Sequence, residues 1–450
     1  MTSFVVEPAT GPLGGEVQVP GDKSIGHRAL LFSLLSRTPV TLRGLGGGAD
    51  NGRTARAIVQ LGATIERDGD LLRVAGRGVG GLGAPAEPID CGNSGTTIRL
   101  LTGLLAGQGF TSTLFGDESL SKRPMRRVID PLTAMGARIA GATRGADTVP
   151  PLTISPAAGG GRRRLTGVSH ELAIASAQVK TALVLAGLYA DGRTTIREPG
   201  PSRDHSERLL AAMGAPIKTR RGEVVIDPSG WDGELAIDAI GVPGDPSSSA
   251  FLLAAALVVG AREVGCRGVC INPTRTGFLD ALAAMGASIA IDNRRTDGGE
   301  PVADLWVRGE APALLPTVIA GDLTVRAIDE VPILAAVAAR AHGTTIVADA
   351  GELRVKESDR IATTVSMLRG FGVEAEARGD GLVIEGAPGP LRAARIDSEG
   401  DHRIAMAAAV LALCADGPSQ IDDVANVATS FPRFVEVMRG LGATIQILED

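Results

Sequence analysis

Lysine, serine and arginine occur together in residues 21–28 (GDKSIGHR), directly after a predicted strand at residues 16–19 and before a predicted apolar helix at residues 29–35. At such a strand-to-helix turn, backbone N–H groups and the helix dipole favour an anion. The stretch therefore predicts a phosphate or oxyanion site whose candidate ligands are Lys23, Ser24 and Arg28. A Walker A loop is excluded because Glu16 stands where its first glycine is required. A capped surface helix with solvated charges stays open at this point.

Similar polar clusters begin five further apolar stretches, at residues 92–99, 175–180, 244–249, 329–332 and 400–403. Two more charged motifs are KRPM at residues 122–125 and LRVKESDR at residues 353–360. Each can be an ordinary helix cap or a solvated charge. Two features favour a functional role. Gly95 allows close approach of a ligand to the backbone, and an acid such as Asp329 is what a hydroxyl nucleophile needs as its base.

A glycine after an apolar residue recurs at intervals of 70 to 86 residues, at Gly62, Gly136, Gly214, Gly286, Gly372 and Gly442. Each ends an amphipathic stretch and precedes a strand-like one, which is the C′ position where glycine takes a left-handed φ at low cost. The interval suits a βαβαββ unit, and the almost entirely aliphatic helices between the glycines are expected to be buried. The sequence therefore predicts an α/β protein built from six such units.

Six units of this size exceed one core, so we expect two domains of three units each, with their buried helices parallel. The last unit lacks a final strand, and residues 3–6 and 16–19 could complete it. We therefore predict a discontinuous domain of residues 1–20 plus 243–450 and a second domain of residues 21–242. Within each domain the polar helix starts should converge on one face, which suits a polyanionic small ligand.

Composition excludes several classes of function. The net charge of −6 argues against a general nucleic-acid binder. The four cysteines have no CxxC spacing and the five histidines form no HxxxH pattern, so we expect neither disulfides nor a metal. No signal pattern or membrane-length apolar run is present, so we expect a cytoplasmic protein with no membrane partner.

Taken together, GDKSIGHR, GNSGTTIR, KRPM, SAQVK, LRVKESDR and DHRIAM, in this order and spacing, resemble the 5-enolpyruvylshikimate-3-phosphate synthase family over essentially the whole chain. The resemblance implies the enolpyruvyl transferase fold. It also implies a transferase that moves the enolpyruvyl group of phosphoenolpyruvate to the 5-hydroxyl of shikimate 3-phosphate through a tetrahedral intermediate. This is a step of the shikimate pathway to chorismate and aromatic amino acids, and the target of glyphosate. We expect a monomer that needs no cofactor.

The resemblance also assigns roles. The base for the 5-hydroxyl would be Asp329, and the groups that transfer protons at the methylene carbon and the departing phosphate would be Glu357 and Lys23. Shikimate 3-phosphate would contact Lys23, Ser24, Arg28, Ser176, Gln178, Arg203, Asp329 and Lys356. Phosphoenolpyruvate would contact Lys23, Asn93, Gly95, Arg123, Gln178, Arg360 and Arg403. Arginine suits both carboxylate and phosphate because its donors form a fixed fork.

The sequence departs from many family members at three peripheral positions. Thr429 and Ser430 stand where a lysine often precedes Phe-Pro, Glu352 replaces an asparagine, and Arg203 replaces an aromatic residue. A related transferase acting on UDP-N-acetylglucosamine is the nearest alternative, but it needs a cysteine that residues 116–123 lack. A non-catalytic anion-binding homologue is disfavoured because both Asp329 and Glu357 are present. An RNA-end cyclase is disfavoured by the acidic charge balance.

Overall fold

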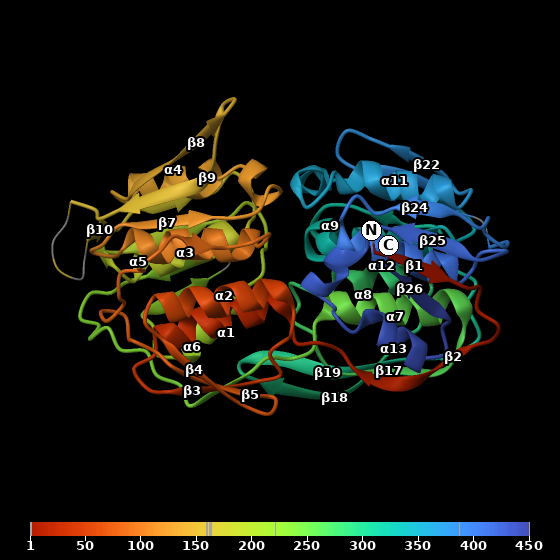
Figure 1. Ribbon diagram of the computed structural model, residues 1–450, viewed down its shortest axis with the longest axis horizontal. Helices are drawn as coiled ribbons and strands as arrows, with labels where there is room; N and C mark the ends of the chain where they lie inside the picture. The colour runs from red at the N-terminus through yellow and green to blue at the C-terminus, as the bar shows by residue number, and fades with distance from the viewer. Residues whose placement is uncertain (1, 159–160, 162–163, 221, 387, 450) are drawn as a thin grey trace. The chain divides into compact units, whose positions relative to one another are not determined.

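The computed structural model describes residues 2–158, 161, 164–220, 222–386 and 388–449. It divides into two compact units, which are described separately (Figure 1). Unit 1 consists of Met1–Asp22, Pro243–Thr296 and Pro301–Asp450, and unit 2 of Lys23–Val242 with Asp297–Glu300.

Within the described residues, each unit contains three four-stranded sheets of one repeated topology. An outer strand pairs in parallel with the next strand, which pairs antiparallel with the third. In unit 2 the sheets are β6 (Ile89–Asp90), β7 (Ser112–Phe115), β9 (Asp147–Ser155) and β8 (Arg138–Arg144); β11 (Ser169–Glu171), β13 (Thr194–Arg197), β15 (Glu223–Ile226) and β14 (Ile217–Arg220); and β16 (Ala239–Gly241), β3 (Val40–Arg43), β5 (Leu71–Ala75) and β4 (Thr64–Asp68). A short parallel pair joins β10 (Leu165–Thr166) and β12 (Ala190–Asp191).

The sheets of unit 1 follow the same order. They are β2 (Leu13–Gln18), β17 (Ala261–Cys270), β19 (Glu300–Gly309) and β18 (Ala290–Asp297); β20 (Val318–Ile319), β21 (Gly343–Val347), β23 (Leu382–Gly386) and β22 (Glu374–Ala377); and β24 (Arg395–Asp397), β25 (Ser419–Asp422), β1 (Ser3–Val6) and β26 (Ile445–Leu448). The fold is therefore α/β with six repeats of one βαβαββ pattern.

The N-terminal strands are shared between repeats differently from the sequence prediction. Strand β1 does complete the last sheet, between β25 and β26. The prediction for the second strand was wrong, because β2 pairs in parallel with β17 and supplies the outer strand of the fourth sheet. The outer position of the fourth sheet is available to β2 because β16, the strand before the fourth repeat, pairs with β3 in unit 2 instead.

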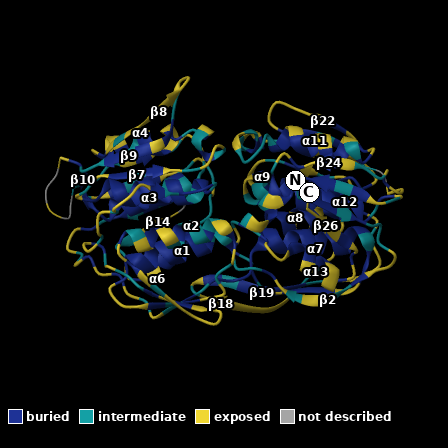
Figure 2. Cartoon of the chain, in the orientation of Figure 1, coloured by how far each residue is buried: buried dark blue, intermediate teal, exposed yellow. Residues whose placement is uncertain are grey.

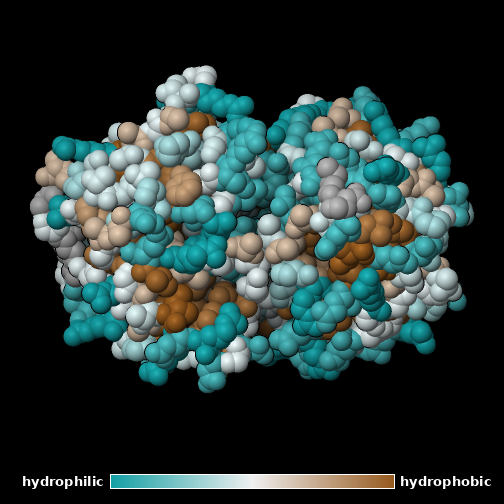
Figure 3. Space-filling view, in the orientation of Figure 1, coloured by the Kyte–Doolittle hydropathy of each residue, from teal (hydrophilic) through white to brown (hydrophobic). Residues whose placement is uncertain are grey.

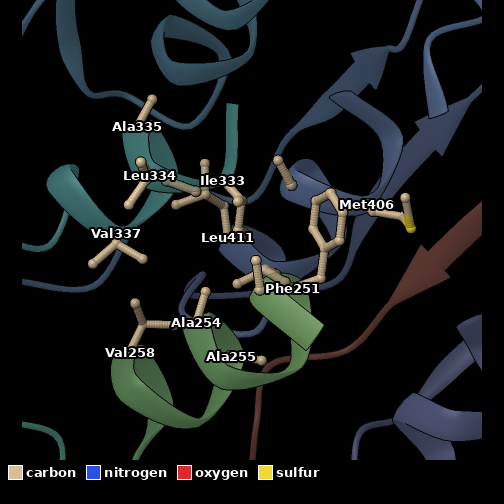
Figure 4. Close-up of a cluster of buried hydrophobic side chains, with 14 of the residues drawn as sticks. Phe251, Ala254, Ala255, Val258, Ile333, Leu334, Ala335, Val337, Met406 and Leu411 are labelled. Atoms are coloured by element: carbon tan, nitrogen blue, oxygen red, sulfur yellow. The ribbon is translucent and has the colours of Figure 1, made fainter. Parts of the chain in front are cut away.

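Six helices form the interiors of the units: α1 (Lys23–Leu34), α3 (Gly95–Ala106), α5 (Ala177–Gly187), α7 (Pro246–Val259), α10 (Val331–Ala338) and α12 (His402–Ala412). Figure 2 shows α1, α3, α7 and α12 buried along most of their length, as expected for helices that are apolar on every side. In unit 1, α10 packs against α7 and α12, where Phe251, Ile333 and Leu411 point toward one another (Figure 4). Helix α1 begins at Lys23, about a turn and a half earlier than predicted.

More exposed helices alternate with these buried ones: α2 (Ala49–Gln60), α4 (Arg126–Ala134), α6 (His205–Ala212), α8 (Gly277–Ala284), α11 (Arg360–Gly370) and α13 (Phe434–Gly440). Each is followed by its predicted glycine at C′, with φ between 81° and 107° in the six cases. The remaining helical segments are α9 (Asp322–Ala327) and the 3₁₀ turns Leu120–Lys122, Ile328–Glu330, Gly351–Val355 and Ala425–Thr429.

On the face of each unit shown in Figure 3, most residues are hydrophilic or intermediate. Hydrophilic residues divide the hydrophobic residues into separate patches. The most exposed large apolar side chains include Val318, Leu315 and Val59. Among the described residues, no helix combines the length and apolar character needed to cross a membrane.

Candidate active site

The starts of α3 and α5 meet in unit 2 through Gln178. Its Nε2 donates to Thr96 Oγ1 (3.0 Å), and its Oε1 accepts from Arg99 Nη1 (2.6 Å). Ser176 is the N-cap of α5, with its Oγ accepting from the Val179 N–H (3.5 Å). Two helix N-termini and one arginine therefore lie side by side, an arrangement that favours an anion.

Arg28 links the start of α1 to α5 and α6. Its side chain is buried, and it donates from Nε to Ser206 Oγ (2.6 Å) and from Nη2 to Thr181 Oγ1 (2.9 Å). Nη1 donates to the Ser24 carbonyl (2.9 Å), and Arg203 Nη1 reaches Ser24 Oγ (3.2 Å). Arg28, Ser24 and Arg203 thus form one connected group, in which Arg28 stiffens the helix start as well as adding charge.

Lys23 occupies the first position of α1, where its Nζ forms an ion pair with Asp50 Oδ2 (2.9 Å). Both side chains are half-buried. Asp50 lies in the first turn of α2 and was not among the residues that the sequence singled out. The ammonium of a lysine at a partly solvated position can exchange one acidic partner for another.

Arg123 and Asn93 lie next to Gly95. Arg123 Nη2 donates to Asn93 Oδ1 (2.7 Å). A Cβ on Gly95 would stand 2.9 Å from Arg99 Nη1 and 3.1 Å from Arg123 Nη1. The missing side chain therefore lets two guanidinium groups approach the N-terminus of α3 closely, and this arrangement suits a carboxylate or phosphate.

Lys180 stabilises the loops that carry Ser176 and Arg203. It is buried and pairs with both Glu198 and Glu207 at 2.8 Å. Glu198 in turn accepts from the Ser176 N–H (2.9 Å). Burial by itself lowers the pKa of Lys180, but the two carboxylates outweigh it and raise the pKa above its ordinary value. The charged form of Lys180 is thus built into the fold.

In unit 1, Asp329 stands at the start of α10 among cations. Its Oδ1 lies 3.4 Å from Lys356 Nζ and 3.6 Å from Arg360 Nη1. Its main-chain carbonyl accepts from Arg403 Nη1 (2.8 Å). The side chain is 14% exposed, so it is not fully enclosed, and contacts fix its position on several sides.

Arg360 is the buried centre of this group. It donates to Asp401 from Nε (2.7 Å) and to Glu357 from Nη2 (2.6 Å). Burial opposes the charge of Arg360, but Asp401 and Glu357 overcome it and raise the pKa. Burial likewise acts to raise the pKa of Asp401, yet the Arg360 guanidinium holds it below its usual range. Both charges therefore persist in the interior.

Arg403 joins the starts of α12, α10 and α7. Besides the Asp329 carbonyl it reaches Ser247 Oγ (3.3 Å) at the start of α7. Asp401 caps α12 by accepting from the Arg403 N–H (2.9 Å). As in unit 2, the N-termini of the three buried helices meet, and their positive dipole ends lie close to the arginines.

The predicted residues divide between the two units. Unit 1 holds Asp329, Lys356, Glu357, Arg360 and Arg403, and unit 2 holds Lys23, Ser24, Arg28, Asn93, Gly95, Arg123, Ser176, Gln178 and Arg203. Their roles toward substrates stay predictions. Sequence reasoning gave no role to Arg99, although its place one helical turn after Gly95 was a usable signal. At one of the three positions where the sequence differs from many family members, Glu352 Oε1 lies 3.8 Å from Lys356 Nζ.

No cluster of three or more histidine, cysteine, aspartate or glutamate side chains in the described part of the chain is arranged to hold a metal ion. The cysteines at positions 91, 266, 270 and 414 are free thiols. Burial raises the pKa of the Cys266 thiol to about 12, and so it is not an activated nucleophile.

Comparisons with known proteins identify the family of the chain. The family model for EPSP synthase (3-phosphoshikimate 1-carboxyvinyltransferase) matches residues 8–438. The 3-phosphoshikimate 1-carboxyvinyltransferase of Syntrophotalea carbinolica is 49% identical over 438 residues, which cover 97% of this chain and 98% of the relative. That of Geobacter metallireducens is 47% identical over 443 residues, covering 98% and 100%.

A solved structure agrees with the sequence comparisons. The EPSP synthase of Acinetobacter baumannii superposes with a TM-score of 0.87 at 39% identity and covers 100% of both chains. The motifs, the six repeats with their converging helix starts and these matches agree, and the chain belongs to the EPSP synthase (3-phosphoshikimate 1-carboxyvinyltransferase) family.

Proposed function

We propose that this protein transfers the enolpyruvyl group of phosphoenolpyruvate to the 5-hydroxyl of shikimate 3-phosphate and releases phosphate, the family's step toward chorismate and the aromatic amino acids. The observation that carries the proposal is the carboxylate of Asp329 within 4 Å of the cations Lys356 and Arg360 at a helix start. A base held among cations can accept a proton beside anionic substrates without repelling them.

The two substrates are anions, and each unit offers donors suited to them. We assign shikimate 3-phosphate to Lys23, Ser24, Arg28, Ser176, Gln178, Arg203, Asp329 and Lys356. We assign phosphoenolpyruvate to Lys23, Asn93, Gly95, Arg123, Gln178, Arg360 and Arg403. The convergence of Arg99 and Arg123 beside Gly95, together with the helix N-termini, supports the phosphoenolpyruvate assignment.

The first chemical step is an addition. The 5-hydroxyl loses its proton to Asp329 and its oxygen bonds to C2 of phosphoenolpyruvate, while the methylene carbon C3 gains a proton and becomes a methyl group. The product is a tetrahedral intermediate that still carries the phosphate. Glu357, whose Oε2 is held by Arg360 Nη2 at 2.6 Å, is the proposed proton donor to C3.

The second step is an elimination. The bond from C2 to the phosphate oxygen breaks, C3 returns a proton, and the enol double bond forms again in the product. Lys23, which can leave Asp50 for a more highly charged anion, is proposed to protonate or neutralise the departing phosphate. Arg360 and Arg403 hold fixed positive charge and need no rearrangement during the step.

Further properties form part of the same proposal. We propose two domains, residues 1–20 with 243–450 and residues 21–242, a monomeric state, and a cytoplasmic location. Glyphosate, an anionic competitor, should inhibit because Arg99 and Arg123 approach the backbone at Gly95, where no side chain separates them from an anion. No nucleic-acid or membrane partner is proposed.

The test is phosphate release from phosphoenolpyruvate with each of two acceptors. With shikimate 3-phosphate, we expect one phosphate released for each enolpyruvyl product. With UDP-N-acetylglucosamine we expect none, because residues 116–123 lack the cysteine of the related transferase. Release with the sugar nucleotide alone would reverse the assignment, and release with neither acceptor would refute it.

A further inference from the structure

Arg275 lies outside the residues assigned to the reaction, yet it is buried in unit 1 with 2% of its surface exposed. A buried charge is costly unless it is paired. Its guanidinium lies 3.1 Å from Asp245, 3.6 Å from Asp22 and 3.8 Å from Glu330. Burial by itself lowers the pKa of Arg275, but these carboxylates outweigh it and raise the pKa, so the side chain remains charged. One cation thus holds three acids from separate parts of the chain.

Two of these acids flank the points where the chain passes from one unit to the other, after Asp22 and after Val242. The two segments also pair through their backbones. The Asp22 N–H donates to the Pro243 carbonyl (2.7 Å), and the Asp245 N–H donates to the Pro20 carbonyl (2.8 Å). Because Arg275 contacts both Asp22 and Asp245, a single side chain fixes both segments, including the residue directly before Lys23.

The third acid connects Arg275 to the proposed site. Ser247 Oγ accepts from Arg275 Nη2 (2.9 Å) and Arg403 Nη2 (3.3 Å), and it donates to the carboxylate of Glu330. Glu330 Oε1 also lies 3.7 Å from Arg403 Nη1. Arg403 is therefore one hydroxyl away from Arg275, and Arg403 itself holds the main chain of Asp329.

We propose that Arg275 is a positioning residue for the transfer reaction: through Ser247 and Glu330 it fixes the side chain of Arg403, and Arg403 in turn holds the main chain of Asp329. The inference rests on the proposed function, from which the roles of Arg403 and Asp329 come. Arg275 does not touch substrate. A displacement of about 1 Å at a reacting group can lower turnover about 100-fold, so loss of this anchor should be visible in the kinetics.

The distinguishing feature is selectivity between the substrates. Most residues assigned to either substrate lie in unit 2, but Arg403, which shares the Ser247 hydroxyl with Arg275, is assigned to phosphoenolpyruvate alone. A purely structural ion pair would change the folded fraction and leave the kinetics of each folded molecule intact. A positioning residue would instead raise KM for phosphoenolpyruvate and lower kcat in the folded protein.

The experiment compares Arg275→Met, Arg275→Lys and Ser247→Ala in the full chain, with Arg308→Met as the control. Arg308 is an exposed arginine of unit 1 that pairs with Glu263. Ser247→Ala removes the bridging hydroxyl without altering charge, so it stays informative if Arg275→Met fails to fold. The readouts are kcat and KM for phosphoenolpyruvate per folded molecule, and Kd for shikimate 3-phosphate by calorimetry.

For Arg275→Met we expect KM for phosphoenolpyruvate to rise and kcat to fall, each about tenfold or more, with Kd for shikimate 3-phosphate within about threefold. Ser247→Ala should change the same two quantities by about three- to tenfold, Arg275→Lys should restore part of the loss, and Arg308→Met should match the wild type. Unchanged kcat and KM in Ser247→Ala and the Arg275 variants would overturn the inference, as would equal losses for both substrates. A wild-type protein inactive with shikimate 3-phosphate would instead overturn the proposed function.

Discussion

Replacing Asp329 with asparagine removes the proposed base while keeping the size of the side chain. The carboxylate lies 3.4 Å from Lys356 Nζ and 3.6 Å from Arg360 Nη1, and it is 14% exposed. Arg360 keeps Asp401 as a buried partner when this charge is lost. The folded state should therefore lose only about 1 kcal/mol, the value typical of a partly solvated pair.

The effect on turnover should be far larger. General base catalysis contributes about 10²- to 10⁴-fold, which corresponds to about 2.7–5.4 kcal/mol at about 1.36 kcal/mol for each factor of ten. Binding of shikimate 3-phosphate should weaken by no more than about tenfold, because one hydrogen bond of about 1 kcal/mol is altered and the contacts in unit 2 remain.

The assay is phosphate release per folded molecule, together with calorimetric Kd for shikimate 3-phosphate. A matched control is Asp422→Asn, since Asp422 is also a largely buried carboxylate of unit 1, paired with Arg395 and Ser3. The control should turn over within about twofold of the wild type because its carboxylate is not assigned to the reaction. If Asp329→Asn also retained turnover within about threefold, Asp329 would have no place as the base.

Three other substitutions test separate parts of the account. Gly95→Ala places a Cβ 3.1 Å from Arg123 Nη1, so KM for phosphoenolpyruvate and the inhibition constant of glyphosate should both rise about tenfold in steady-state assays; unchanged inhibition would remove Gly95 from that pocket. Asp401→Asn leaves Arg360 without its buried partner and should cost about 3 kcal/mol in urea unfolding at pH 7. Because the pKa of Asp401 is lowered on folding, its stabilisation is present above pH of about 4 and is lost as the pH falls through the folded-state pKa. The difference between Asp401→Asn and wild type should therefore shrink in acid, and a constant difference would contradict this. Lys180→Met leaves two buried carboxylates without their shared cation and should cost about 3–5 kcal/mol by the same measurement, and a loss below about 1 kcal/mol would show that the ion pairs add little stability.

Features set by neighbouring residues were predictable from the sequence. The glycines after the amphipathic helices have positive φ because the helix end itself demands a left-handed residue, and this constraint is local. The six buried helices were predictable because they are apolar on every side. The same pattern reveals the repeat and, through it, the α/β class.

Features set by distant pairing were not predictable. The parallel register of β2 with β17 joins residues about 250 positions apart, and a period-two pattern does not name a partner strand. Helix α1 begins at Lys23, and its buried Arg28 donates to α5 and α6, contacts that no local propensity indicates.

Some residues of the candidate site were likewise predictable from the sequence, and others were not. Residues such as Asp329 and Gln178 stand in polar clusters at helix starts, where sequence reasoning could find them. Arg275 is a single arginine in a loop between β17 and α8, and only the structure shows that it contacts Asp22, Asp245 and Ser247. A buried network of this kind has no sequence period, and its members are recognised by their contacts alone.

The most direct test of the central claim, transfer by addition and elimination at C2, uses phosphoenolpyruvate labelled with ¹⁸O at the oxygen that bridges C2 and phosphorus. The account requires the bond between C2 and this oxygen to break. With shikimate 3-phosphate as acceptor, mass spectrometry should find the label in the released phosphate and none in the enolpyruvyl product. Label remaining with the carbon fragment would mean that the bond between phosphorus and oxygen breaks instead, and that result would contradict the proposed transfer.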